Sequence, residues 1–86
     1  METLLVVHEV DDVKHCLASP KRDEFFGPLG MTVRTFRDPA GSNRVGLMFE
    51  VPSRAEFEEA LQTEEAAEAM KFDGVRPETI LVLEEG

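Results

Sequence analysis

The chain has 86 residues, of which 42% are hydrophobic and 31% are charged, and its net charge is −9. This length allows one hydrophobic core, so we expect a single domain over residues 1–86. The composition is too apolar for a disordered protein, and the excess of acid argues against nucleic acid or an anionic membrane as a partner, because both select clustered Lys and Arg.

The sequence carries no signal for membrane insertion or export. Its longest apolar run, residues 4–7, is far shorter than the roughly 18 residues that a spanning helix needs, and no basic segment precedes it. The only cysteine, Cys16, cannot form a disulfide within the chain. We therefore expect a cytoplasmic protein that is stabilised by packing alone.

The first half of the chain predicts a strand, a broken helical segment and a second strand. Residues 3–10 are aliphatic on both alternating sets of positions, which is typical of a central strand. The polar pair Asp11 and Asp12 offers an N-cap for a short helix, which Ser19 and Pro20 end before a further helical turn begins. After a Gly- and Pro-containing turn, residues 31–38 alternate as a strand.

The second half repeats this order. Residues 44–51 alternate as a strand that forms a hairpin with the preceding one, and Ser53 with Glu56 predicts a capping box at the start of a helix. Thr63 offers a second N-cap, Gly74 ends the helix, and residues 79–83 form the last strand.

The order strand-helix-strand-strand-helix-strand predicts a ferredoxin-like α+β fold. In this fold a four-stranded antiparallel sheet has its first and third strands in the centre and both helical connections on one face. The other face is then left bare, although the strands supply it with large apolar side chains, either those of Leu5, Val7, Phe36, Met48, Leu81 and Leu83 or those of their alternating partners.

These six side chains predict a homodimer that packs through the bare sheet face. Covering them is worth roughly 9–18 kcal/mol in all, against an association cost of about 4–15 kcal/mol. The alternative is a monomer whose strands carry scattered exposed aliphatic residues.

Few residues suggest chemistry. His8 lies near the end of the first strand among apolar positions, which suits a core histidine, a ligand contact or an acid-base group. His15 and Cys16 are neighbours on a helix, about 100° apart, which is poor geometry for a shared metal or a nucleophilic pair. We expect no metal site, and the glycines form no phosphate-binding loop that would indicate a nucleotide cofactor.

Four stretches of the sequence, residues 8–11, 36–39, 49–52 and 70–78, resemble small dimeric α/β-barrel proteins near the antibiotic biosynthesis monooxygenases. That superfamily includes cofactor-independent monooxygenases, isomerases, cyclases and haem-degrading enzymes, and the resemblance implies a ligand cavity between sheet and helices. Related sequences follow the histidine with an acidic residue and then a tryptophan. This chain keeps His8 and Asp11 but has no Trp or Tyr, and His15 lies near the tryptophan position, so a haem-degrading or aromatic-oxygenating role is disfavoured and no cofactor is expected.

Two hypotheses of different classes follow. In the first, the protein binds or transforms a small apolar or anionic metabolite in a cavity lined by His8, His15, Arg34, Phe36 and Met48. His8 would move a proton, and Arg34 would hold an anionic group. In the second, the protein is a non-catalytic dimeric module with structural or regulatory purpose, and its interior is closed and fully packed.

Overall fold

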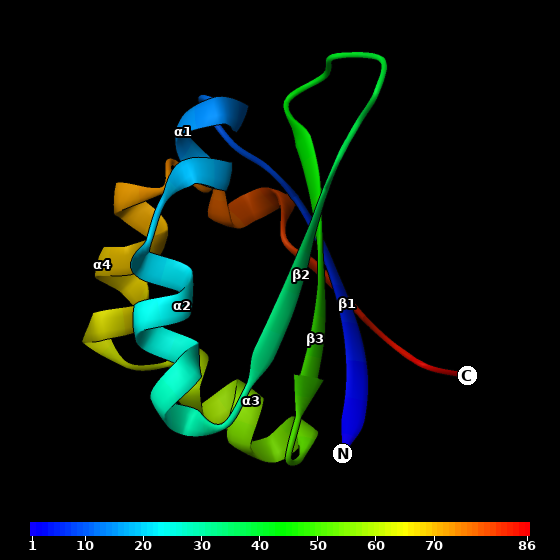
Figure 1. Ribbon diagram of the computed structural model, residues 1–86, viewed down its shortest axis with the longest axis vertical. Coiled ribbons are helices and arrows are strands. Elements are labelled where there is room, and N and C mark those ends of the chain that lie inside the picture. The colour runs from blue at the N-terminus through cyan, green and yellow to red at the C-terminus, as the bar shows by residue number, and fades with distance from the viewer.

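In the computed structural model, which describes residues 1–86, four strands form one antiparallel sheet (Figure 1). They are β1 (Glu2–Glu9), β2 (Thr32–Arg37), β3 (Arg44–Val51) and β4 (Leu81–Glu84), and they lie in the order β2-β3-β1-β4. The first and third strands are therefore central. The predicted ferredoxin-like α+β fold is confirmed.

Both helical connections are broken into two helices, and all four helices lie on the same side of the sheet (Figure 1). These are α1 (Val13–Ala18), α2 (Lys21–Phe26), α3 (Arg54–Leu61) and α4 (Glu64–Phe72), with short 3₁₀ turns at Gly27–Leu29 and Pro77–Thr79. None of them combines the length and apolar character that crossing a bilayer requires.

Side-chain caps explain where three of the helices begin. Asp12 accepts the main-chain N–H of His15 at 3.1 Å, and Thr63 accepts that of Ala66 at 3.2 Å. Ser53 accepts the N–H of Glu56 at 3.2 Å and donates its hydroxyl to the Glu56 carboxylate at 3.4 Å. Each cap satisfies an N–H that the first turn leaves without a helical partner, and of the predicted pair Asp11 and Asp12 it is Asp12 that caps α1. The capping box forms only in part, because the Glu56 carboxylate accepts the Ser53 hydroxyl and not a main-chain N–H.

The core lies between the sheet and the helices. Leu4 and Val6 of β1 and alternate residues of β3 point to this side and are buried. Phe49 of β3 is its centre: its ring lies 4.9 Å, centroid to centroid, from both Phe26 of α2 and Phe57 of α3. Tilted and edge-on aromatic pairs at this spacing add to the stabilisation that burial alone provides.

The opposite side of the sheet, called the open sheet face, carries the first of the two alternating sets that the sequence left open: Leu5, Val7, Phe36, Met48, Leu81 and Leu83. The strand register places Leu5 beside Met48 and Leu83, and Val7 beside Leu81. Phe36 pairs with Gly46, which itself pairs with Val7, so Phe36 lies in the same row of the sheet as Val7 and Leu81. Phe36, Leu81 and Leu83 are 43%, 53% and 45% exposed, so no element of the chain covers this face.

Candidate functional site

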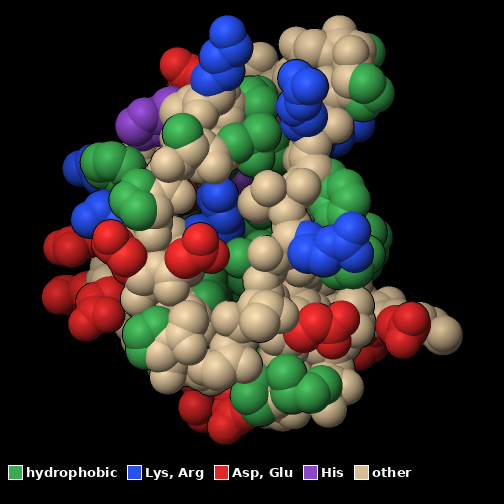
Figure 2. Space-filling model, in the orientation of Figure 1, with side chains coloured by type: hydrophobic (Ala, Val, Ile, Leu, Met, Phe, Trp, Pro, Cys, Tyr) green, Lys and Arg blue, Asp and Glu red, His purple; other side chains and the backbone are tan.

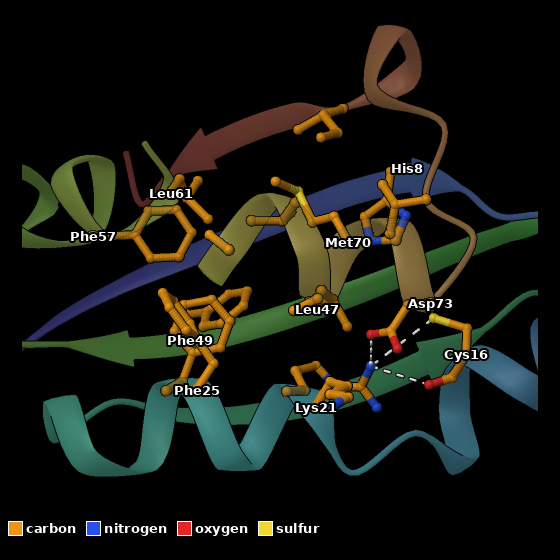
Figure 3. Close-up of a pocket in the computed structure, with 17 residues that line it drawn as sticks. His8, Cys16, Lys21, Phe25, Leu47, Phe49, Phe57, Leu61, Met70 and Asp73 are labelled. Atoms are coloured by element: carbon orange, nitrogen blue, oxygen red, sulfur yellow. Dashed lines mark hydrogen bonds and ion pairs between the residues drawn. The ribbon is translucent and has the colours of Figure 1, made fainter. Parts of the chain in front are cut away.

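A cavity of about 70 Å³ lies between the sheet and the helices, and 13 of its 17 lining residues are hydrophobic. Figure 2 shows a narrow opening between the helical layer and the sheet. Phe25, Phe57 and Leu61 lie at one end of the cavity, while His8 and Asp73 lie at the other (Figure 3). The cavity therefore has an apolar end and a polar end.

His8 contributes from the sheet to the polar end. It follows Leu4 and Val6 on the inward-facing set of β1, which is why its side chain is only 4% exposed. Its Nδ1 atom is buried and has no hydrogen-bond partner in the chain. Burial lowers the pKa of His8 below its ordinary value of 6.5, because an apolar environment disfavours the charged imidazolium. His8 is therefore neutral at neutral pH.

Asp73 contributes from the helices. It is the C-cap of α4, where its main-chain N–H donates to the carbonyl of Ala69 at 3.0 Å. Its Oδ1 atom is buried without a hydrogen-bond partner, and its Oδ2 atom lies 3.7 Å from Nη1 of Arg22. That distance suits an ion pair but exceeds the length of a hydrogen bond. Neither carboxylate oxygen thus accepts a hydrogen bond from the chain.

Arg22 completes the polar end and ties three helices together. Its Nη1 donates to the carbonyl of Cys16 at 3.2 Å, and its Nη2 lies 3.5 Å from the carbonyl of Leu17. These carbonyls belong to the last turn of α1, where the Cys16 carbonyl also accepts the main-chain N–H of Ser19 at 3.2 Å. Arg22 sits on the buried face of α2, one turn before Phe26, and is itself only 9% exposed.

Cys16 also lines the cavity, with its Sγ 3.9 Å from Nη1 of Arg22. Burial raises the pKa of the thiol, and this effect exceeds the opposing influence of the Arg22 charge. The thiol is accordingly protonated at neutral pH, which is the wrong state for a nucleophile.

The structure does not bring the five sequence-predicted site residues together, because only His8 lines the cavity. His15 is exposed on α1, where its Nε2 lies 2.8 Å from the carbonyl of Phe72. Arg34, Phe36 and Met48 are on the open sheet face.

Strand parity explains this correction. Along β3, the odd-numbered residues of residues 45–51 are buried toward the helices, so Met48 points the other way. Arg34 pairs with Met48 and Phe36 with Gly46, which places both on the same open face as their partners. There the Arg34 guanidinium lies 5.5 Å from the centroid of the Phe36 ring.

The sequence reasoning missed Arg22 and Asp73 as parts of the polar end. One signal for Arg22 was its spacing: it lies four residues before Phe26 and thus on the apolar stripe of the same short helix. A charged residue on that stripe is unusual enough to indicate a buried partner. Asp73 gave no comparable signal, because Asp before Gly is an ordinary helix end.

No family model matches the sequence, and no curated protein matches it either. Solved structures do resemble it. The crystal structure of an antibiotic biosynthesis monooxygenase superimposes with a TM-score of 0.66 at 14% identity, covering 100% of this chain and 97% of the other. A candidate antibiotic biosynthesis monooxygenase from Deinococcus radiodurans gives a TM-score of 0.57 at 9% identity, with 100% and 91% coverage. At these identities the likeness shows a shared fold, which is the one that the sequence resemblance implies.

Proposed function

We propose that this protein binds a small, mainly apolar molecule in the helix-side cavity, with His8 as its hydrogen-bonding and proton-accepting group. The observation that carries the proposal is a pair of buried polar atoms, Nδ1 of His8 and Oδ1 of Asp73, that have no partner in the chain. Buried polar atoms nearly always have partners. Two such atoms at the wall of an otherwise apolar cavity are typical of a binding site.

The size of the cavity limits the ligand. At about 70 Å³ it is smaller than the roughly 300–1,000 Å³ of sites that enclose drug-sized molecules. It is also about half of the ~150 Å³ of a cavity that holds benzene. A slender ligand would therefore lie partly in the cavity and partly in its opening, with its polar part near His8 and Asp73.

His8 supports a specific kind of chemistry. A neutral imidazole with a free ring nitrogen can take a proton from an acidic C–H or O–H of a bound molecule, which leaves an imidazolium and an enolate or alkoxide until the proton returns. Two structures with this fold are described as antibiotic biosynthesis monooxygenases, one of them as a candidate. For this chain we favour proton transfer at His8, a step that isomerases, cyclases and cofactor-independent oxygenases can share.

A ligand screen by NMR tests this proposal. Small apolar metabolites that bind should shift the amide signals of cavity-lining residues such as Leu47 and Met70. His8→Phe keeps a ring but removes both nitrogens, so these ligands should bind at least tenfold more weakly, the size of one lost hydrogen bond to a buried group. His15→Phe is the matched control, since His15 lies outside the cavity. Ligands that bind His8→Phe as tightly as the unchanged protein would refute the role of His8.

We also propose that the protein assembles as a homodimer through the open sheet face. All six apolar side chains lie on this face. Covering them is worth roughly 9–18 kcal/mol, against an association cost of about 4–15 kcal/mol. Charge adds a second support. Arg44 and Glu50 lie on this face at opposite ends of the central strand β3. A two-fold axis perpendicular to the strands would set Arg44 of one copy opposite Glu50 of the other.

The alternative function is a non-catalytic dimeric module, and the open sheet face alone would support it. In such a module the buried atoms Nδ1 of His8 and Oδ1 of Asp73 would stay without hydrogen-bond partners, which lowers the stability of a closed interior. For this reason we favour ligand binding.

A further inference from the structure

We infer that the ligand of the helix-side cavity is an uncharged molecule whose hydroxyl or N–H group donates a hydrogen bond to Oδ1 of Asp73. This inference rests on the proposed function, which it narrows from a cavity to a ligand class. The sequence alone left open whether the metabolite is apolar or anionic. This inference keeps the uncharged class and excludes the anionic one.

The need for a donor follows from Asp73. A carboxylate can only accept hydrogen bonds, and its two oxygens offer about four positions for donors. The side chain of Asp73 is 8% exposed, yet Oδ1 has no donor and Oδ2 has only the Arg22 guanidinium at 3.7 Å. A buried carboxylate in this state is poorly solvated. A hydroxyl or N–H group of a molecule bound in the cavity can supply the missing donor.

The need for an uncharged ligand follows from the groups around Asp73. Arg22 carries one positive charge that balances the negative charge of Asp73, and His8 is neutral because burial lowers its pKa. Arg22 also directs its Nη atoms at the carbonyls of Cys16 and Leu17. An anionic ligand at the polar end would meet the negative charge of Asp73, whose counter-charge Arg22 is already paired. The other cation at the cavity wall, Lys21, has its Nζ 5.3 Å from the centroid of the Phe72 ring, which lies outside the lining. The hydrophobic residues of the lining would solvate neither an anion nor a cation.

His8 provides the second contact for the same group. Its Nδ1 is unpartnered and lies at the polar end with Asp73 (Figure 3). A neutral imidazole nitrogen donates or accepts according to its tautomer. A hydroxyl or an amide contains both a donor and an acceptor, so it matches the hydrogen-bonding character of both side chains.

Four probes with one slender apolar body separate these possibilities: 1-hexanol, hexanamide, 1-methoxyhexane and hexanoate. Their affinities for the unchanged protein, for Asp73→Asn and for the exposed control Asp23→Asn are measured by NMR titration of the cavity amides. We expect hexanol and hexanamide to bind about 10–100-fold more tightly than the ether or the carboxylate, as a hydrogen bond to a charged acceptor requires. Asp73→Asn should reduce this preference toward unity, and Asp23→Asn should retain it.

The outcomes are distinct. If the ether or hexanoate binds the cavity as tightly as hexanol, the donor inference is wrong and the cavity remains a binding site. If no probe shifts the cavity amides, the proposed function is wrong as well. Because the unchanged protein already ranks the probes, the inference stays testable even if Asp73→Asn does not fold.

Discussion

Nη1 of Arg22 lies 3.7 Å from Oδ2 of Asp73 inside the protein, and this ion pair joins α2 to the end of α4. Their side chains are only 9% and 8% exposed. A pair in this position is weak as a source of net stability, because both groups have left water. Removing one partner is a different matter, since the other charge then stays buried alone.

The first prediction concerns this pair. Arg22→Met should lower the free energy of unfolding by about 3–5 kcal/mol, because it leaves Asp73 without its counter-charge. Arg54→Met is the matched control: Arg54 pairs with Glu58 and Glu84 on the surface, where such pairs contribute about 0–1 kcal/mol. Urea denaturation measures both. Equal losses for the two variants would show that Arg22 and Asp73 are not coupled in the interior.

The second prediction is a pH dependence due to His8. Its pKa is lowered in the folded state. Below pH 6.5 the imidazole of His8 is therefore protonated in the unfolded chain and still neutral in the folded chain. The free energy of unfolding should therefore be constant above this pH and fall as the pH drops toward the folded-state pKa.

Denaturation between pH 7.5 and 5.5 checks this, in a window above most carboxylate titrations. His8→Phe should flatten the profile. A profile in which His8→Phe retains the full slope would assign the effect to another group.

How far the sequence specifies this molecule depends on the type of feature. Alternation along β1 and β3 sorted the side chains into two sets correctly, because a strand's period of two assigns each side chain to one side, but it did not say which set faces the helices. The same parity would have kept Phe36 and Met48 out of a cavity that His8 lines, so that error came from grouping residues by type rather than by face.

The polar end of the cavity could not be predicted from the sequence, and the reason is physical. Arg22, Asp73 and His8 come from α2, the end of α4 and β1, and only the packing of three elements brings them together. No spacing in the chain encodes such a contact. The local caps at Asp12, Ser53 and Thr63, by contrast, depend on neighbours three residues away.

The third prediction concerns Gly74, which follows Asp73. Its φ is +73°, and a Cβ there would lie 3.4 Å from Cβ of Asp11. Gly74→Ala should destabilise the fold by about 1–3 kcal/mol, since side chains rarely adopt this conformation. Gly46→Ala is the control, because Gly46 has no positive φ and a Cβ there would lie 3.6 Å from Cβ of Phe36, an ordinary contact, so it should be neutral or stabilise by up to about 1 kcal/mol. Thermal denaturation measures the stability of both variants. Equal effects would show that the positive φ of Gly74 is not the cause of the loss.

The last prediction tests the proposed dimer through charge. Glu50→Arg sets like charges opposite each other if Arg44 faces Glu50 of the second copy, so the dissociation constant should rise at least tenfold. Arg44→Glu should have the same effect, and the double variant should restore much of the affinity because opposite charges meet again. Arg37→Glu is the control, since Arg37 pairs with the buried Val45 and so lies on the other side of the sheet. Sedimentation at several concentrations measures each constant. Weakening by both single variants without recovery in the double would place the partner in another orientation, and a stable monomer of the unchanged protein at micromolar concentration would overturn the dimer.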